Sequence, residues 1–319
     1  MSDLLAIRNL VVEYPVGGGR HVHAVSDVTL TVKQGETLGL VGESGSGKSS
    51  LARALLQLPP PKAGAVMFDG KDLTQMRGQA LRAMRPRLQM IFQDPIASLN
   101  PRRKVAEIIA EPLIVSGVSD AAERTRRVRA VMEAVGLDPD LVWNRRPHEF
   151  SGGQCQRIAI ARALVLEPSL IVCDEPVSAL DVSIRAQIVN LLEDMKARFG
   201  LTLLFIAHDL AVVKSVSDRV AVMYLGRLCE VADSDSLFAT PAHPYTAALM
   251  AAIPVPDPDV PLGDTKLKPG DPPSPLDPPS GCRFRTRCPH AQPRCSDEVP
   301  PLRQIAPGRE VACHFPLVG

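Results

Sequence analysis

The chain has 319 residues, more than one typical domain, and its 45% hydrophobic and 22% charged residues exclude disorder for most of it. A net charge of +1 gives no electrostatic argument for binding nucleic acid or an anionic membrane. No apolar run approaches the ~18 residues of a membrane span, and the first residues lack the basic and apolar regions of a signal peptide. We therefore expect a cytosolic protein.

Prolines and cysteines are unevenly distributed along the chain. Residues 1–253 hold 14 of the 30 prolines, whereas residues 254–319 hold the other 16. Four of the seven cysteines also lie in this last part. We predict two domains, a main body over residues 1–253 and an irregular C-terminal appendage, rich in proline and cysteine, over residues 254–319.

The predicted strands are of two kinds. Apolar and polar residues alternate over residues 6–14 and 25–32, as in an antiparallel sheet with one solvated face. Three later segments are almost wholly apolar, as in parallel strands covered by helices on both faces: residues 37–41, 170–173 and 203–207. This combination predicts an α/β layered core with an antiparallel β subdomain.

Helical patterns fill most of the remaining body. The clearest helix follows Asp181, and we expect Ser183 to cap its start and Gly200 to end it. Residues 95–165 contain helical pattern but no comparable strand, which predicts a helical insertion. An arginine-rich face in this insertion could contact an acidic partner or lipid headgroups, although a solvated helix face explains it more simply. Its members are Arg124, Arg126, Arg127 and Arg129.

A glycine-rich loop follows the apolar strand over residues 37–41. The phosphate-loop pattern G-x-x-x-x-G-K-S/T is matched in full by Gly42-Glu43-Ser44-Gly45-Ser46-Gly47-Lys48-Ser49, and Ser50 continues into a helical stretch. In such loops, backbone N–H groups surround the phosphates of a bound nucleotide. We expect Lys48 to reach the β- and γ-phosphates and the Ser49 hydroxyl to coordinate Mg²⁺.

Two carboxylates end a later apolar strand. Asp174 and Glu175 directly follow residues 170–173, and open α/β sheets bind ligands at the carboxyl ends of their strands. Asp174 can hold Mg²⁺ directly or through water, which leaves Glu175 to polarise an attacking water. In isolation, such a pair more often belongs to the start of a helix. The phosphate loop makes the hydrolytic role the better interpretation.

Further motifs resemble those of ATP-binding-cassette (ABC) ATPases in order and spacing. Phe150-Ser151-Gly152-Gly153-Gln154 would by itself be a helix start with a capping serine, but here it resembles the signature sequence of that family. The other motifs resemble the adenine-stacking aromatic (Tyr14), the Q-loop glutamine (Gln93), the D-loop ending in Asp181 and the switch histidine (His208). The resemblance covers roughly residues 4–235 and implies an ABC-type P-loop NTPase core.

The resemblance also implies how ATP is hydrolysed. In the family, the signature helix completes the phosphate site of the opposite subunit, so two ATP molecules are expected at the interface of a head-to-tail dimer. Gln93 would sense Mg²⁺ and the attacking water. His208 would hydrogen-bond the γ-phosphate and hold Glu175 in place; a structural histidine is the alternative.

Three stretches look like the ATPase subunits of bacterial oligopeptide and dipeptide importers, a group that includes nickel importers: residues 93–101, residues 243–249 and the terminal cysteine region. This similarity implies a peripheral ATPase on the cytoplasmic face of the inner membrane that drives peptide uptake. Its partners would be a second ATPase subunit, identical or paralogous, two transmembrane permeases and an extracytoplasmic substrate-binding protein. Nickel or another small solute is an alternative cargo. ABC ATPases that act on nucleic acid or ribosomes usually carry two cassettes or a long coiled coil, so we expect no nucleic acid partner.

The last cysteines have the spacing C-x5-C-x6-C-x17-C and are Cys282, Cys288, Cys295 and Cys313. Zinc sites favour closer C-x2–4-C pairs, so the spacing does not predict simple zinc binding. Some members of the resembled subfamily carry a 4Fe–4S cluster here, which four thiolates can ligate. Four reduced thiols in a loop are the alternative, and His290 or His314 could replace one ligand.

Overall fold

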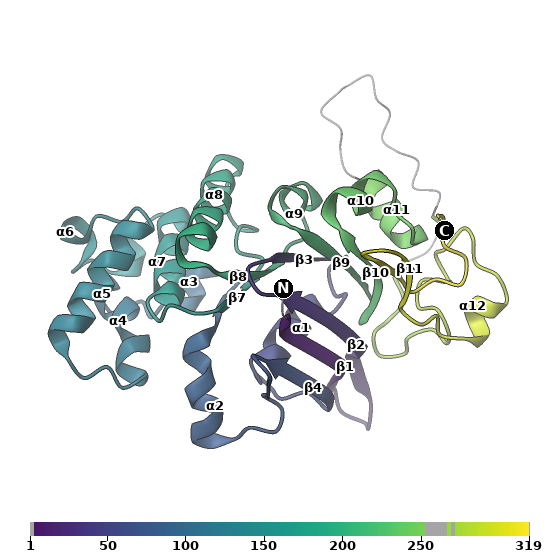
Figure 1. Ribbon diagram of the computed structural model, residues 1–319, viewed down its shortest axis with the longest axis horizontal. Coiled ribbons are helices and arrows are strands. Elements are labelled where there is room, and N and C mark those ends of the chain that lie inside the picture. Colours follow the sequence, from purple (N-terminus) through teal and green to yellow (C-terminus); the bar gives the residue numbers. More distant parts are fainter. Residues whose placement is uncertain (1–2, 253–266, 269–271, 319) are drawn as a thin grey trace. The chain divides into compact units, whose positions relative to one another are not determined.

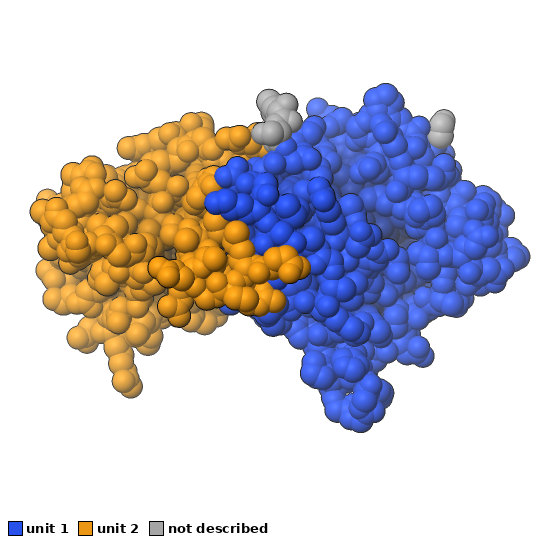
Figure 2. Space-filling view, turned by 60° about the horizontal axis from the view of Figure 1, so that its bottom comes forward, with its two compact units in different colours: residues 1–33, 37–74, 207–319 blue, residues 34–36, 75–206 orange. Residues whose placement is uncertain are grey.

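The computed structural model describes residues 3–252, 267–268 and 272–318, and the chain divides into two compact units (Figure 2). The first unit comprises residues 1–33, 37–74 and 207–319, and the second comprises residues 34–36 and 75–206. The predicted domain boundary between residues 253 and 254 lies outside the described residues. Among the described helices, none combines the length and the apolar character needed to cross a membrane.

Four strands of the first unit form an antiparallel sheet (Figure 1). They are β1 (Asp3–Pro15), β2 (His21–Lys33), β4 (Ala63–Phe68) and β5 (Lys71–Asp72), in the order β2-β1-β4-β5. Ile7 of β1 pairs with Leu30 of β2 and with Val66 of β4, and all three side chains are buried. The predicted alternation therefore buries one face of this sheet.

Five neighbouring strands of an eight-stranded sheet also belong to this unit, and two of them come from the chain's C-terminal segment. They are, in order, β11 (Arg303–Ala306), β12 (Arg309–Val311), β10 (Arg227–Asp233), β9 (Arg219–Tyr224) and β3 (Thr37–Val41). Only the pair β3 and β9 is parallel. Val311 pairs with Glu230, so the C-terminal segment, yellow in Figure 1, extends the sheet of the first unit beyond β10.

Short helices complete the first unit. They are α1 (Lys48–Leu55), α9 (Leu210–Val216), α10 (Ser234–Ala239), α11 (Pro244–Ala251) and α12 (Arg294–Asp297). Helix α9 lies very close to β3, because a Cβ atom on Gly39 would stand 2.6 Å from a methyl carbon of Val213. Glycine at position 39 therefore permits this helix to pack directly on the strand.

The second unit contains three parallel strands in the order β8 (Thr202–Ile206), β7 (Leu170–Asp174) and β6 (Leu88–Ile91). All residues of β7 and β8 are buried, as their apolar sequences predict. Helix α8 (Val182–Phe199) ends at Gly200 in the left-handed conformation, with φ of 63°, also as predicted. The predicted cap at Ser183 is wrong: Asp181 is the N-cap residue, and Ser183 already lies in the first turn.

The helical insertion contains no strand between residues 95 and 164. Its helices are α3 (Pro95–Ser98), α4 (Val105–Val115), α5 (Ala121–Ala134), α6 (Pro139–Val142) and α7 (Gly152–Leu164), with a 3-10 turn at Pro147–Glu149. Before it come α2 (Gly78–Met84) and a 3-10 turn at Arg85–Arg87. Ile109 and Leu113 of α4 and Ile158 of α7 are buried in its core.

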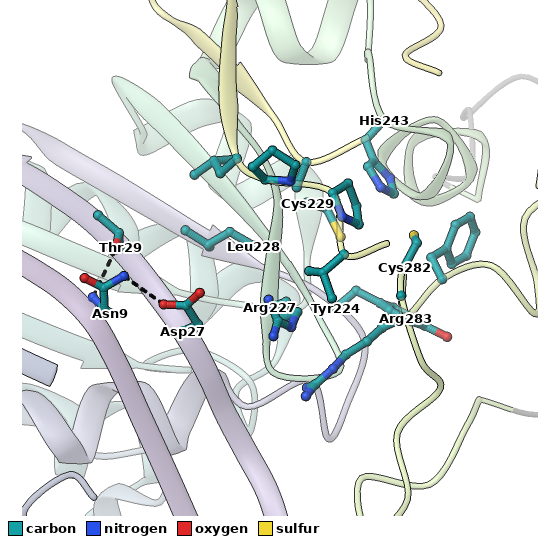
Figure 3. A pocket seen from close by; sticks show the side chains of 17 residues that line it. Asn9, Asp27, Thr29, Tyr224, Arg227, Leu228, Cys229, His243, Cys282 and Arg283 are labelled. Atoms are coloured by element: carbon teal, nitrogen blue, oxygen red, sulfur yellow. Dashed lines mark hydrogen bonds between the residues drawn. The ribbon is translucent and has the colours of Figure 1, made fainter. Parts of the chain in front are cut away.

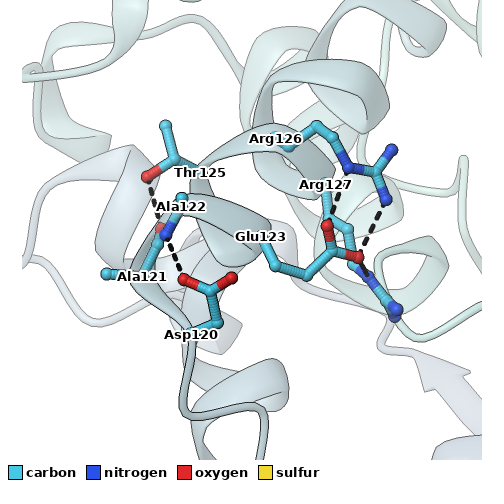
Figure 4. A network of polar contacts seen from close by, with 7 residues as sticks. All are labelled: Asp120, Ala121, Ala122, Glu123, Thr125, Arg126 and Arg127. Atoms are coloured by element: carbon cyan, nitrogen blue, oxygen red, sulfur yellow. Dashed lines mark hydrogen bonds and ion pairs between the residues drawn. The ribbon is translucent and has the colours of Figure 1, made fainter.

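The arginine-rich face lies on α5 (Figure 4). The Nε atoms of Arg126 and Arg127 each lie 2.7 Å from an oxygen of Glu123 on the same helix. Asp120 accepts a hydrogen bond from the N–H of Ala122 and caps the start of the helix. Because these two guanidinium groups are paired within their own helix, the solvated-face interpretation accounts for them without a partner.

Candidate active site

The predicted phosphate loop lies between β3 and α1 in the first unit. Gly47 is the N-cap residue of α1 with φ of 101°, and Gly42 has φ of 152°. A Cβ atom on Gly42 would collide with the carbonyl oxygen of Met223, and one on Gly47 with that of Ala24. Only glycine fits these two positions, so the pattern of the motif follows from the close approach of neighbouring backbone.

Lys48 is folded into this loop. Its Nζ donates hydrogen bonds to the carbonyl oxygens of Gly42 (2.7 Å) and Glu43 (2.9 Å) and to Ser46 Oγ (3.3 Å), and the residue is 5% exposed. Helix α1 begins at the end of this loop, so the positive N-terminal end of the helix adds to the attraction of the loop for anions. Ser49 and Ser50 lie half-buried in the first turn of α1, and Ser44 and Gly45 form the exposed rim.

Asp174 and Glu175 lie at the carboxyl end of β7 in the second unit. Asp174 is 2% exposed and pairs with Ile206 of β8. Glu175 has φ of 47°, a left-handed conformation that is unfavourable for a residue with a side chain, and its N–H donates to the carbonyl oxygen of Ile206 (2.9 Å). Backbone strain of this kind concentrates at functional sites.

The structure brings Gln93 and Glu175 together. Gln93 follows β6, the strand beside β7, and its Nε2 donates a hydrogen bond to Glu175 Oε2 (2.9 Å). The Ser178 hydroxyl donates to the carbonyl oxygen of Glu175 (3.1 Å) and fixes the turn that follows. The amide thus orients the carboxylate that the sequence assigns to water activation.

The signature residues begin α7 in the second unit. Ser151 is its N-cap and forms a reciprocal capping box with Gln154: Ser151 Oγ accepts from the Gln154 N–H (3.3 Å), and Gln154 Oε1 accepts from the Ser151 N–H (3.0 Å). Gly152 and Gly153 follow without side chains. A Cβ atom on Gly153 would stand 2.5 Å from a methyl carbon of Ile184, so this glycine permits α7 to pack against α8.

The remaining predicted residues lie on three separate elements. Tyr14 is in β1, paired with Val22 of β2. His208 is exposed and precedes Asp209, whose carboxylate caps α9. Asp181 caps α8 through its backbone, because no hydrogen bond of its side chain with the helix is present.

The four terminal cysteines line one small cavity, together with His290 and His314. The space between them is about 10 Å³, room for roughly one water molecule. Burial, and to a lesser extent the nearby cysteines, raise the pKa of the Cys313 thiol to about 11. Among the described residues, no group of three histidine, cysteine or carboxylate side chains could hold a metal ion. The cysteine pattern thus predicted the convergence of the thiols, whereas the residues as arranged do not support the expected 4Fe–4S cluster.

A cavity of about 550 Å³ lies beside the cysteine cavity in the first unit, between β1, β2, β10 and the C-terminal segment (Figure 3), and the two cavities share Cys282 in their walls. On its wall, Asn9 donates to Asp27 Oδ1 (2.8 Å) and its N–H donates to Thr29 Oγ1 (3.0 Å). No residue of the phosphate loop lines this cavity, so it is not the nucleotide site.

Sequence reasoning missed the outer contacts of the phosphate loop. Tyr245 and Arg287 both reach Glu43 from the C-terminal part of the first unit. The stretch 243–249 was singled out by its similarity to a family, which gave no role to Tyr245. Arg287 had no signal beyond its place between two cysteines.

Comparisons with known proteins cover both parts of the chain. Residues 25–178 match the family model described as ABC transporter, and residues 229–295 match the model described as the C-terminal region of the oligopeptide/dipeptide transporter family. The oligopeptide transport ATP-binding protein OppF of Escherichia coli is 55% identical over 309 residues, which are 94% of this chain and 92% of OppF. OppF of Salmonella typhimurium is 54% identical over the same shares of both chains.

Solved structures of ATP-binding cassettes also match the body of the chain. The dimeric structure of the ATP-binding cassette MJ0796 in a post-hydrolysis state, bound to ADP and Pi, matches with a TM-score of 0.66 and 29% sequence identity. The match covers 72% of this chain and 98% of that one.

Proposed function

Because this chain belongs to the ABC transporter family, in its group of oligopeptide and dipeptide transport ATP-binding proteins, we propose that it hydrolyses ATP to drive the uptake of peptides. The family and the α/β fold of an ABC cassette were both predicted from the sequence and are confirmed. The observation that carries the proposed activity is the formed phosphate loop, with Lys48 held inside it by loop oxygens.

ATP and Mg²⁺ fit the chemistry of the residues present. Backbone N–H groups of the loop and the start of α1 would bind the β- and γ-phosphates, and Lys48 would exchange its carbonyl partners for phosphate oxygens. Mg²⁺ prefers oxygen ligands, which the Ser49 hydroxyl, the Asp174 carboxylate and the Gln93 amide oxygen can supply. Tyr14 would stack on the adenine.

We assign the activation of water to Glu175. Its carboxylate already accepts a hydrogen bond from Gln93, and its strained backbone holds it at the end of β7. A carboxylate in this role would orient the water and accept its proton, while Lys48 would stabilise the charge on the transferred phosphoryl group; Mg²⁺, when bound, would supply further positive charge there. His208 would hydrogen-bond the γ-phosphate.

A second ATPase subunit would complete each site. The α7 helix begins at Ser151, which is exposed, and the positive end of a helix favours an anionic phosphate. The solved cassette MJ0796 is dimeric with ADP and Pi bound, which supports a dimer with two nucleotides at its interface. The signature residues of one subunit would face the phosphates bound by the other subunit, and so would its D-loop aspartate. These residues are Ser151, Gly152, Gly153, Gln154 and Asp181. The second subunit is either identical or a paralogue.

The subunit would act on the cytoplasmic face of the membrane, bound to two transmembrane permeases and supplied by an extracytoplasmic substrate-binding protein. Relatives named for oligopeptide transport over 94% of this chain support this assembly. The test is peptide uptake into proteoliposomes that contain the ATPase subunits and permeases, with the binding protein outside. ATP-dependent uptake supports the proposal; ATP hydrolysis without uptake of any peptide, but with uptake of nickel or another small solute, would reassign the cargo.

We also propose a 4Fe–4S cluster on the terminal cysteines, and this proposal depends only on the number and type of the available ligands. Four thiols converge on one cavity, but in the arrangement described no three of these residues could hold a metal ion. A cluster is wider than a single ion, so the segment would have to open around it, and the thiols would have to lose their protons. Protein purified without oxygen should then contain iron and acid-labile sulfide in near-stoichiometric amounts; the absence of both iron and zinc would contradict any metal role.

A further inference from the structure

Glu43, the second residue of the phosphate loop, is held from both sides. On the inner side, its carbonyl oxygen accepts hydrogen bonds from Lys48 Nζ (2.9 Å) and from the Ser46 N–H (3.1 Å). On the outer side, its N–H donates to the hydroxyl oxygen of Tyr245 (2.9 Å). The orientation of the peptide groups on both sides of Glu43 is therefore fixed by contacts outside the loop as well as within it.

The Glu43 carboxylate is bound by an arginine of the C-terminal segment. Arg287 Nη1 lies 2.8 Å from Oε2 and 3.0 Å from Oε1 of Glu43. The side chain of Arg287 is only 11% exposed, and that of Glu43 is 30% exposed. Such a part-buried pair is screened less by water than a surface pair, and removing one partner leaves the other unpaired and poorly solvated.

An aromatic cluster fixes the two residues that hold Glu43. Tyr245 packs against Tyr224, with ring centroids 4.6 Å apart, and against Phe284 at 5.2 Å. The carbonyl oxygen of Phe284 accepts hydrogen bonds from the N–H groups of Arg287 and Cys288, both at 3.0 Å. The turn between Cys282 and Cys288 is thereby anchored on the body of the first unit, with Arg287 directed at the phosphate loop.

We propose that Arg287 and Tyr245 are positioning residues that hold the phosphate loop in its nucleotide-binding shape, so that the C-terminal segment sets the affinity for ATP. This inference rests on the proposed function, because it requires the loop to bind nucleotide. Both residues reach the phosphate loop through Glu43, and neither is among the residues assigned to bind the phosphates. A loop that is ordered before binding loses less conformational entropy when the ligand arrives, and affinity rises accordingly.

The test compares nucleotide affinity with turnover in the full-length chain. Arg287→Met should raise the Kd for Mg–ADP, measured by calorimetry, by about tenfold, the range expected for the loss of a hydrogen bond between charged groups. The kcat at saturating ATP, measured with the second subunit present, should stay within about twofold of the wild type because the reacting groups are untouched. Arg287→Lys should recover part of the affinity, since it keeps the charge and the contact with Glu43 comes from a single nitrogen, Nη1.

Four further variants separate the effect of this contact from a general loss of structure. Glu43→Gln should weaken binding to the same degree, and the Glu43→Gln/Arg287→Met double variant should be no weaker than either single variant. Tyr245→Phe removes only the hydroxyl and should also raise the Kd. Arg285→Met is the matched control, because Arg285 lies in the same turn but its guanidinium group donates to Ser280 and not to Glu43; it should leave the Kd unchanged.

A wild-type Kd in folded Arg287→Met would overturn the inference, as would additive losses in the double variant or a fall in kcat at unchanged Kd. The proposed function is tested separately by Lys48→Met. If the wild-type protein binds Mg–ADP and Lys48→Met does not, nucleotide binding at the loop is supported whatever the result for Arg287→Met. If the wild-type protein itself binds no nucleotide, the proposed function fails first.

Discussion

The two compact units contribute different parts of the nucleotide chemistry. The first unit holds the phosphate loop, and residues far along the chain fix the loop from outside through Tyr245 and Arg287. The second unit holds the strained carboxylate Glu175, oriented by Gln93, and the start of the signature helix α7. By the proposed assignments, most groups that would bind the phosphates lie in the first unit and the groups that would activate water lie in the second, with the signature residues of α7 as the exception.

This difference implies that affinity and turnover can be changed separately. Substitutions around the phosphate loop should mainly change the Kd for nucleotide, whereas substitutions at the end of β7 should mainly change kcat. The chain also offers a probe for each unit. Its single tryptophan, Trp143, is in the second unit, and its three tyrosines, Tyr14, Tyr224 and Tyr245, are in the first.

The largest expected effect is on turnover in the second unit. Glu175→Gln keeps the size and the hydrogen bond acceptor of the side chain but removes its charge, so kcat should fall by about a hundredfold or more while ATP still binds. Steady-state hydrolysis and ATP binding would be measured on the same preparation. Glu193→Gln, on the exposed face of α8, is the matched control. Undiminished hydrolysis in Glu175→Gln would refute the assigned role.

How much of this the sequence predicted depends on how local each feature is. The phosphate loop is contiguous, and its glycines are dictated by nearby backbone, so the pattern alone located it. The contact between Gln93 and Glu175 joins residues 82 apart and was reachable only through a family resemblance. Tyr245 and Arg287 lie 202 and 244 residues from Glu43, and each is ordinary in its own segment, so nothing in the sequence pairs them.

Smaller errors have similarly physical reasons. Asp181 and Ser183 are both capping residue types, and the choice between them depends on where the turn after Glu175 ends, which composition does not determine. The four cysteines line one cavity, but the volume of that cavity depends on how the surrounding turns pack, which the cysteine spacing does not determine.

The next largest effect should be a loss of stability of the first unit in acid. His243 is 2% exposed, and burial lowers its pKa to about 4. Its Nδ1 accepts a hydrogen bond from the Tyr245 N–H (3.0 Å), so protonation there would break the cap of α11. The unfolded chain, with a histidine pKa near 6.5, binds more protons between pH 6.5 and 4. Stability should therefore fall as the pH drops through this range, by at most about 3 kcal/mol.

Urea unfolding followed by tyrosine circular dichroism and by Trp143 fluorescence would measure this in the two units. The tyrosine signal should show the pH dependence more strongly than the tryptophan signal. His243→Asn keeps a capping side chain but cannot titrate, so its unfolding free energy should change less between pH 6.5 and 4. An equally steep pH dependence in this variant would assign the effect to other groups.

A weaker effect should link the cysteine segment to the phosphate loop. Cys288 is 8% exposed and directly follows Arg287. Cys288→Ser places a more polar group in this site and should raise the Kd for Mg–ADP by about threefold, a size typical of coupling through packed neighbours. In an Arg287→Met background, the same change should have no further effect. Cys155→Ser, a buried cysteine of the second unit, is the control and should leave the Kd unchanged.

The smallest effect should come from an exposed arginine–carboxylate arrangement on α5. Hydrogen bonds from Arg126 and Arg127 lower the pKa of Glu123 to about 2, so any stabilisation it gives is present above pH 4.5 and lost as the pH falls toward 2. Arg126 is 68% exposed, however, and water screens such pairs. Glu123→Gln should therefore leave the urea midpoint at pH 7, followed by Trp143 fluorescence, and the Kd for Mg–ADP unchanged. The same substitution at Glu43, paired with an arginine that is 11% exposed, should raise the Kd. Equal outcomes at the two positions would mean that burial of the pair does not decide its contribution.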